Sequence, residues 1–200
     1  MTLRASLERA RVLAIMRRPD IGEVVLDLLE QLHTAGVRAV EVTLDRPEAP
    51  DALRRLVEHA PPDTLIGAGT VLTTEQVDTV ADAGGSFVVC PHVDPRLIER
   101  GLARGVPVIP GIATATEIVT ARAAGARVLK LFPAGPLGIP FLRALLGPFH
   151  DVAFVPTGGI AVDEVPAWIE AGAICVGLGG ALVRADGVDP KLPEVVRRVT

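Results

Sequence analysis

Two charged side chains lie inside segments that are otherwise apolar, and both are of types that carry out chemistry. Lys130 lies in the middle of Arg127-Val128-Leu129-Lys130-Leu131-Phe132-Pro133, and Glu41 lies within Ala39-Val40-Glu41-Val42-Thr43-Leu44. Burial of an amine favours its neutral form, which attacks carbonyl carbons to form Schiff bases. Burial of a carboxyl group raises its pKa towards the range of a general acid or base.

Each of these residues also has a simpler structural interpretation. A lysine in a strand can lie at a sheet edge and extend its ammonium into water along an apolar stem. A glutamate in a strand can form a structural ion pair with a neighbouring strand. The two residues have complementary charges, however, and only two of the 20 basic residues in the chain are lysines. Their occurrence together favours a catalytic pair.

The rest of the chain predicts regular alternation of strands and helices, because glycine-terminated helical segments repeatedly precede short β-branched runs. The predicted strands are Leu13–Met16, Ala39–Leu44, Leu65–Val71, Phe87–Cys90, Val106–Pro110, Val128–Phe132, Ala153–Pro156 and Ile174–Leu178. The helices predicted to follow them are Glu23–Ala35, Asp51–His59, Thr74–Ala83, Pro95–Arg104, Ala115–Ala124, Ile139–Gly147, Asp163–Ala171 and Leu192–Val199.

Eight strand–helix pairs in order predict an α/β fold, a (β/α)8 TIM barrel formed as a single domain by residues 1–200. A short amphipathic helix within Met1–Arg11 precedes the first strand. A doubly wound open sheet is the alternative, but no G-x-G-x-x-G follows the first strand. Active sites of such barrels lie at the C-terminal ends of the strands, so the polar residues there are expected to converge.

Three predicted site residues lie near the ends of the third, fourth and sixth strands. Thr70 ends Gly67-Ala68-Gly69-Thr70, where its hydroxyl can either bind a carboxylate or cap the next helix. Pro91 follows the fourth strand and can form a pocket wall. Phe132 shares a strand face with Lys130, because alternate side chains of a strand point the same way.

Paired glycines follow the last two strands. Pro156-Thr157-Gly158-Gly159-Ile160 comes after the seventh strand, and Gly177-Leu178-Gly179-Gly180 comes after the eighth. Barrels of this type often bind phosphate at these two places, through backbone N–H groups and a helix N-terminus. The two motifs together therefore predict a phosphate site.

Composition excludes several classes of partner. A net charge of −4 and an aromatic content of 3% give no reason to expect nucleic acid. No apolar run approaches the ~20 residues of a membrane span, and the charged N-terminus does not resemble a signal peptide, so a cytoplasmic location is expected. Cys90 and Cys175 lack the spacing of a disulfide framework and are expected to be buried, and the scattered histidines do not predict a metal site.

In order and spacing, these motifs resemble those of the class I 2-keto-3-deoxy-6-phosphogluconate (KDPG) aldolases. The resemblance extends to their relatives that act on 2-dehydro-3-deoxy-6-phosphogalactonate or 4-hydroxy-2-oxoglutarate, and it runs from about Ala14 to Leu182. The segments that carry it are Glu41–Leu44, Gly67–Leu72, Pro91, Pro110–Gly111, Ala113–Glu117, Leu129–Ala134 and Pro156–Ile160.

The resemblance implies a Schiff-base aldolase that cleaves KDPG to pyruvate and glyceraldehyde 3-phosphate with no metal or organic cofactor. It implies that Lys130 is the Schiff-base lysine and that Glu41 transfers protons, partly through a water. It further implies that the protein is a homotrimer and that its small-molecule partner, the substrate, is a phosphorylated 2-keto-3-deoxy sugar acid. The implied substrate-binding residues are Thr70 for the pyruvyl carboxylate, Pro91 and Phe132 as apolar walls, and Thr157, Gly158, Gly159, Gly179 and Gly180 around the phosphate.

Two positions depart from the pattern of KDPG aldolases. Asp45, followed by Arg46, stands where those enzymes usually carry an arginine, and an anion cannot replace a guanidinium in binding a carboxylate. Arg17 matches an arginine of the phosphogalactonate relatives and is the alternative carboxylate ligand. Gly180 stands where a serine is common, so one hydroxyl donor to the phosphate is missing.

These departures leave the natural substrate open. The same chemistry on 2-dehydro-3-deoxy-6-phosphogalactonate, or on an unphosphorylated 4-hydroxy-2-oxo acid, is the first alternative. A non-catalytic sugar-phosphate-binding barrel or a phosphate-binding isomerase is the second. Neither protein of this second kind requires a lysine inside a strand, so Lys130 favours the aldolase.

Overall fold

The main strands are buried on both faces. This is expected where helices cover one face of a parallel sheet and other strands cover the opposite face. The computed structural model describes residues 2–17, 23–180, 182–184 and 187–200, and every residue of β1 (Val12–Met16) and β2 (Ala39–Thr43) is buried in it. The predicted N-terminal helix is α1 (Leu3–Ala10), with Thr2 as its N-cap. Met1, which the prediction included, lies outside the described residues.

The remaining elements alternate along the chain in the predicted order. The strands are β3 (Leu65–Gly69), β4 (Val88–Val89), β5 (Val108–Ile109), β6 (Gly111–Ile112), β7 (Val128–Leu131), β8 (Ala153–Pro156), β9 (Val176–Leu178), β10 (Val183–Arg184) and β11 (Gly187–Val188). The helices are α2 (Glu23–Thr34), α3 (Ala49–His59), α4 (Thr74–Asp82), α5 (Pro95–Arg104), α6 (Ala115–Ala123), α7 (Ala134–Leu146), η1 (Val162–Glu164, a 3-10 turn), α8 (Val165–Glu170) and α9 (Leu192–Val199). Within the described ranges, none of these helices has the length and apolar character needed to cross a membrane.

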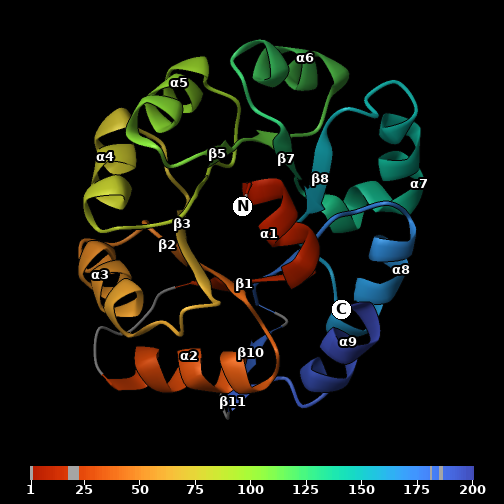
Figure 1. The fold of residues 1–200 in the computed structure, drawn as a ribbon. Helices are drawn as coiled ribbons and strands as arrows, with labels where there is room; N and C mark the ends of the chain where they lie inside the picture. Colours follow the sequence, from red (N-terminus) through yellow and green to blue (C-terminus); the bar gives the residue numbers. More distant parts are fainter. Residues whose placement is uncertain (1, 18–22, 181, 185–186) are drawn as a thin grey trace.

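The strands form two parallel sheets that curve around a common centre, with α2 to α9 outside them (Figure 1). One sheet has the order β5-β4-β3-β2-β1-β9, and the other has the order β6-β7-β8. Thr157 forms a parallel bridge with Gly177, which connects the end of β8 to β9. The short pair β10–β11 is antiparallel and separate. The predicted α/β class with parallel strands is therefore confirmed.

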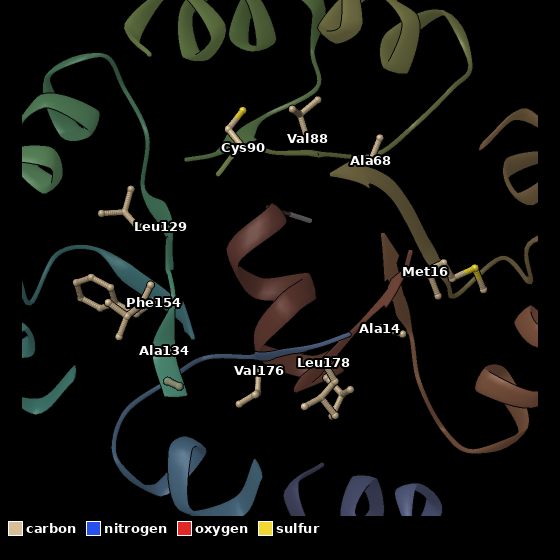
Figure 2. Close-up of a cluster of buried hydrophobic side chains, with 14 of the residues drawn as sticks. Ala14, Met16, Ala68, Val88, Cys90, Leu129, Ala134, Phe154, Val176 and Leu178 are labelled. Atoms are coloured by element: carbon tan, nitrogen blue, oxygen red, sulfur yellow. The ribbon is translucent and has the colours of Figure 1, made fainter. Parts of the chain in front are cut away.

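Alternation along the strands divides the core into an outer and an inner layer. Side chains of the outer layer, such as Ala14, Leu129 and Phe154, point from the strands towards the surrounding helices (Figure 2). The inner layer consists of Leu7, Ala10, Leu13, Ala39, Phe87, Val89, Ile109, Val128, Ala153, Val155, Ile174 and Cys175. Two of these residues belong to α1, which lies across the centre of the strands in Figure 1. Complete burial of a leucine such as Leu7 contributes about 1.5–3 kcal/mol, so α1 is an integral part of the core.

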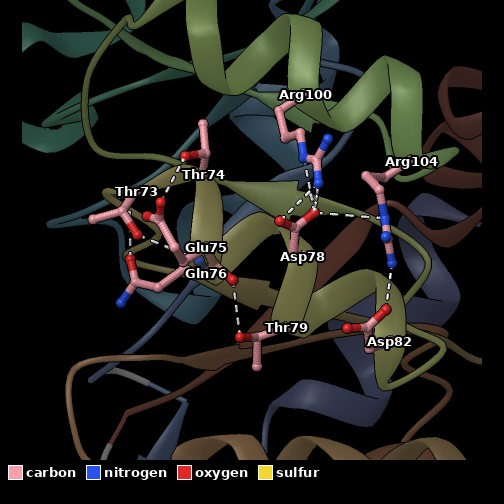
Figure 3. Close-up of polar contacts among 9 residues, drawn as sticks. All are labelled: Thr73, Thr74, Glu75, Gln76, Asp78, Thr79, Asp82, Arg100 and Arg104. Atoms are coloured by element: carbon pink, nitrogen blue, oxygen red, sulfur yellow. Dashed lines mark hydrogen bonds and ion pairs between the residues drawn. The ribbon is translucent and has the colours of Figure 1, made fainter.

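Helix α4 is held by its own cap and by ion pairs to α5 (Figure 3). Thr73 Oγ1 accepts a hydrogen bond from Gln76 N at 3.3 Å, and Gln76 Oε1 accepts one from Thr73 N at 3.3 Å, which is a capping box. Arg100 donates two hydrogen bonds to Asp78, at 2.8 and 2.9 Å. Because these contacts lie at the surface and are screened by water, we expect them to orient the two helices rather than to dominate stability.

Most strand boundaries differ from the predictions by one or two residues, and two of the differences have a clear local cause. The third strand was predicted to extend to Val71 but ends at Gly69, because Thr70 has a left-handed φ of 57° that an extended strand does not allow. The segment Val106–Pro110 was predicted as one strand, whereas β5 ends at Ile109 and β6 begins at Gly111. Pro110 separates them because proline has no N–H to donate to a neighbouring strand.

Two helices and one hairpin also differ from the predictions. Helix α7 begins at Ala134 instead of Ile139 and contains a break at Gly138, whose φ of 78° and ψ of 164° are not helical. The segment predicted as one helix from Asp163 begins with the 3-10 turn η1 before α8. The pair β10–β11 was not predicted, because two-residue strands are too short to show a period.

Candidate active site

A cavity of about 590 Å³ opens where the carboxyl ends of β1, β3, β7, β8 and β9 converge. The sequence-predicted site residues that line it are Arg17, Thr70, Pro91, Lys130, Phe132, Thr157, Gly158, Gly159, Gly179 and Gly180. These are all of the predicted residues except Glu41, which is buried on β2. The fold therefore brings together residues that are spread over more than 160 positions of the sequence.

Lys130 lies on the inner face of β7. Its neighbours Leu129 and Leu131 are fully buried in the outer core layer, so the pleat of the strand directs Lys130 inward. The Lys130 residue is 8% exposed, and its Nζ atom lies 4.9 Å from the centroid of the Phe132 ring. Because β7 pairs with β6 on one side and β8 on the other, the interpretation of Lys130 as an edge-strand lysine is wrong.

Glu41 is almost completely buried, with 1% of its surface exposed. Its Oε2 atom has no hydrogen-bond partner among the described residues. Burial raises the pKa of Glu41 above its ordinary value, and the positive charges of Lys130 and Arg17 oppose this rise without cancelling it. A carboxyl group held in this state can change its protonation during a reaction at moderate pH.

The main chain of β3 makes room for the Glu41 carboxylate. Gly69 has no side chain, and a Cβ atom built on it would lie only 1.6 Å from Glu41 Oε1. The three atoms nearest to that position all belong to Glu41. Gly69 therefore allows the carboxylate to occupy its present position, and no larger residue can replace it without moving Glu41.

Thr70 and Arg17 line the cavity at the ends of β3 and β1. The alternative interpretation of Thr70 as a helix cap is wrong, because Thr73 is the N-cap of α4. The left-handed conformation of Thr70 is unfavourable for a β-branched residue, and such strain is common at functional sites. Asp45 accepts a hydrogen bond of 2.9 Å from Thr43 Oγ1.

The distal end of the cavity is formed by the loops after β8 and β9. Gly158 and Gly159 have left-handed φ values of 89° and 75°, and a Cβ on Gly158 would lie 2.8 Å from the Phe132 ring. Turns of this kind can present backbone N–H groups to an anion. Thr157 directs its hydroxyl to the carbonyl oxygen of Val155 at 3.2 Å. Gly180 is exposed, and a Cβ at that position would meet no atom within 4 Å.

Comparison with known proteins identifies the family. Residues 3–198 match the family described as KDPG and KHG aldolase. The chain belongs to this aldolase family. The 2-dehydro-3-deoxy-phosphogluconate aldolase of Treponema pallidum (strain Nichols) is 38% identical over 189 residues, which cover 94% of this chain and 89% of the relative. The 2-dehydro-3-deoxy-6-phosphogalactonate aldolase of Escherichia coli (strain K12) is 40% identical over 152 residues, covering 76% and 74%.

A solved aldolase structure agrees with this assignment. It is the KDPG aldolase from Legionella pneumophila with pyruvate captured at low pH as a covalent carbinolamine intermediate. It is 32% identical, has a TM-score of 0.85, and covers 100% of this chain and 96% of its own. The resemblance to this aldolase family that the sequence motifs predicted is thus confirmed.

Sequence reasoning missed several residues that line the aldolase cavity: Ile15, Ile160, Ala161, Glu164 and Gly177. Glu164 is the most consequential because it carries a charge. Its Oε2 atom accepts a hydrogen bond of 2.7 Å from Ala161 N. The available signal was its position, four residues after Ile160 in the segment that leads from the predicted phosphate loop into the next helix.

Other residue types suited to catalysis are not arranged for it in this aldolase. Cys90 and Cys175 are free and buried, as predicted. Burial raises the pKa of Cys90 to about 12 and also raises that of Cys175, so neither supplies a thiolate at neutral pH. Across the described part of the chain, no three histidine, cysteine or acidic side chains form a group that could hold a metal ion.

Proposed function

We propose that this chain is a class I aldolase that cleaves KDPG to pyruvate and glyceraldehyde 3-phosphate through a Schiff base on Lys130. The observation that carries the proposal is the position of Lys130, whose nearly buried side chain lines the cavity where the strands end. Few structural roles require an amine at such a place, because burial of an ammonium group is unfavourable. The carbinolamine captured in the Legionella pneumophila relative supports the same chemistry here.

The first half of the reaction makes an electron sink on Lys130. The neutral amine attacks the C2 ketone carbon of the substrate and forms a carbinolamine, which loses water to give a protonated imine. The ring of Phe132 lies against Nζ and limits the access of water to this linkage. The imine carries the positive charge that later accepts the electron pair of the broken carbon–carbon bond.

The second half of the reaction requires proton transfers, which we assign to Glu41. The Glu41 carboxylate takes the proton of the C4 hydroxyl, directly or through a water. The C3–C4 bond then breaks and the C4 aldehyde leaves. The electron pair of the broken bond stays with C3 and converts the imine to an enamine. Glu41 returns the proton to C3, and water hydrolyses the resulting imine to release pyruvate and free Lys130. A raised pKa suits this exchange, because the group must both accept and give a proton.

Residues on opposite sides of Lys130 are assigned to the two ends of the substrate. Thr70 and Arg17 bind the carboxylate of the pyruvyl part, and the exposed Arg17 guanidinium takes the role that Asp45 cannot fill. Pro91 and Phe132 form apolar walls. The backbone of the loops after β8 and β9 receives the phosphate. The same assignment accommodates 2-dehydro-3-deoxy-6-phosphogalactonate or an unphosphorylated 4-hydroxy-2-oxo acid as the alternative substrate.

We also infer that the two sheets together form one closed (β/α)8 barrel and that residues 1–200 are a single domain. The bridge between Thr157 and Gly177 joins β8 to β9. Pro110 links β5 directly to β6, so the two sheets share one interrupted strand. The trimeric assembly implied by the family resemblance and the cytoplasmic location expected from the sequence stay predictions.

The proposal can be tested by trapping the Schiff base. Incubation with pyruvate and borohydride should reduce the imine and add the mass of the reduced pyruvyl group to the peptide that contains Lys130. The variant Lys130→Met should show no adduct, and Lys191→Met serves as the control because it removes the other lysine, which is exposed and paired with Asp163. An unmodified Lys130 peptide in the wild-type protein would rule out the mechanism and favour a non-catalytic sugar-phosphate-binding protein.

A further inference from the structure

We propose that Glu164 is a specificity-determining residue that weakens phosphate binding at the distal end of the cavity and so widens the substrate range towards unphosphorylated acids. This inference rests on the proposed aldolase function and concerns the same cavity. Glu164 lines that cavity together with Gly158, Gly159 and Ala161. It is the only carboxylate among the lining residues that the structure describes.

The position of the Glu164 carboxylate places it in competition with an anionic ligand. Its Oε2 atom lies 2.7 Å from Ala161 N, so it already occupies a backbone N–H at the edge of the glycine loop. A phosphate that used this donor would have to displace the carboxylate. A phosphate that bound to Gly158 and Gly159 alone would have a negative charge close by, which is repulsive.

Two other features at the distal end also reduce its capacity to bind phosphate. The Thr157 hydroxyl donates to Val155 O at 3.2 Å, so its proton is directed away from a ligand. Gly180 supplies no side-chain donor, although the space beside it is open. The cationic side chains that line the cavity are Arg17 and Lys130, and the second becomes part of the imine. Few hydrogen-bond donors or cationic side chains at the distal end therefore offset the repulsion between the Glu164 carboxylate and a phosphate.

Glu164 also has a structural role, since its bond to Ala161 N closes the turn η1. A purely structural role and a role in specificity make different predictions. Loss of the turn would affect every substrate in the same way, because it would disturb the loop as a whole. An electrostatic role would affect only substrates that carry the phosphate.

The test compares Glu164→Gln with the matched control Asp163→Asn. The glutamine side chain of the first variant keeps an oxygen that can accept from Ala161 N, so the variant removes the charge while preserving the turn. Asp163 is the adjacent carboxylate, but it binds Lys191 Nζ at 3.2 Å on the exposed surface and does not line the cavity. Both variants remove one negative charge within two neighbouring positions, so they separate the effect of location from that of net charge.

The quantity to measure is kcat/KM for KDPG relative to kcat/KM for 4-hydroxy-2-oxoglutarate. E164Q should raise this ratio about fivefold, the size expected for one screened charge near a partly exposed site. D163N should leave the ratio within about twofold of wild type. Equal changes for both substrates in E164Q, or an equal rise in D163N, would overturn the proposal.

Direct binding of inorganic phosphate provides a readout that does not depend on catalysis. Titration with phosphate, followed by the NMR signals of the Gly158 and Gly159 amides, should show about fivefold tighter binding in E164Q and no change in D163N. Unchanged binding in E164Q would contradict the inference about Glu164. Pyruvate trapping on Lys130 tests the proposed function separately, because pyruvate carries no phosphate.

Discussion

The proposed catalytic pair, Lys130 and Glu41, consists of buried side chains on strands, whereas the distal end of the cavity consists mainly of loop backbone and carries one exposed carboxylate. Lys130 and Glu41 are 8% and 1% exposed. Gly159, Gly180 and Glu164 are all exposed. Strand residues are held by pairing on both sides and by the core layers, so their positions leave little freedom. Loops at strand ends tolerate substitution more readily.

The same difference applies to the two glutamates of the site. Glu41 lies where water is excluded, so its charge is unfavourable and its pKa is raised. Glu164 lies where water screens its charge, and it binds a backbone N–H. The comparison suggests that reaction chemistry depends on the buried end and that substrate choice depends on the exposed end. Changes at the first end should therefore be large and general, and changes at the second should be small and selective.

The largest effect is expected from Lys130→Met. Removal of the amine eliminates the covalent step, so cleavage of every substrate should fall by about 10⁴-fold or more. Steady-state rates with KDPG and with 4-hydroxy-2-oxoglutarate would measure this loss. A loss confined to the phosphorylated substrate would contradict the contrast between the two ends of the cavity, because it would give Lys130 a role in substrate binding rather than in the reaction.

Glu41→Gln should lower kcat by roughly 10²–10⁴-fold, again for all substrates, because proton transfer is lost while the shape is kept. Borohydride trapping with pyruvate should still modify Lys130 in this variant. Trapping that failed together with turnover would indicate that Glu41 maintains the site rather than moving protons.

The same variant should become more stable relative to wild type as the pH rises. The folded protein holds the Glu41 proton more tightly than the unfolded chain, whose glutamate titrates near 4.5. The free energy of unfolding of the wild type therefore falls as the pH rises from there through the raised pKa. The glutamine side chain of the variant has no such titration, so the stability of E41Q relative to wild type should be higher at neutral pH than below pH 4.5. Urea unfolding at several pH values would measure the difference, and a constant difference would contradict it.

Gly69→Ala should reduce stability by about 1–3 kcal/mol, because the added methyl group overlaps the Glu41 carboxylate. The effect should become much smaller in a Glu41→Ala background, where the overlapping atoms are absent. Gly67→Ala is the control, since its added carbon would meet the Phe87 ring and main chain at 2.6 Å and its cost should not depend on Glu41. Additive effects of G69A and E41A on unfolding would show that the two positions do not interact.

The smallest effect is expected at the distal end, from Gly180→Ser. The space beside Gly180 is open and its φ is not left-handed, so a serine fits without strain. Its hydroxyl adds a donor, and kcat/KM for KDPG should rise by a few fold while the value for 4-hydroxy-2-oxoglutarate stays the same. Gly180→Ala controls for the added carbon. A gain of similar size with both substrates would show that this end does not select for phosphate.

The proposed catalytic pair could be picked out from the sequence because burial of charge is unusual. Lys130 and Glu41 stand out inside apolar strands, and strand alternation directs both to the inner face. The glycine pairs were predictable in the same way, since their order after the last strands matches a recurrent anion site. The resemblance to the aldolase family then suggested a role for each of these residues in one proposed mechanism.

Glu164 and Gly69 could not be predicted in this way. Glu164 directly follows Asp163, and nothing local distinguishes the carboxylate that lines the cavity from the one that binds Lys191. Gly69 reads as an ordinary turn glycine until the pairing of β2 with β3 brings it against Glu41. The sequence likewise left open whether Arg17 reaches the cavity, and the structure shows that Arg17 lines it.

The sequence by itself determined the alternation of strands and helices, the residues that share each strand face, and the two charged strand residues that we propose as the catalytic pair. These properties depend on the two-residue period of a strand and on the unfavourable burial of charge, both of which are local. Only the tertiary structure decided that Gly69 makes space for the Glu41 carboxylate and that Glu164 borders the loop proposed to bind phosphate. Such contacts depend on strand register and on the direction of turns, which are set by packing between distant parts of the chain.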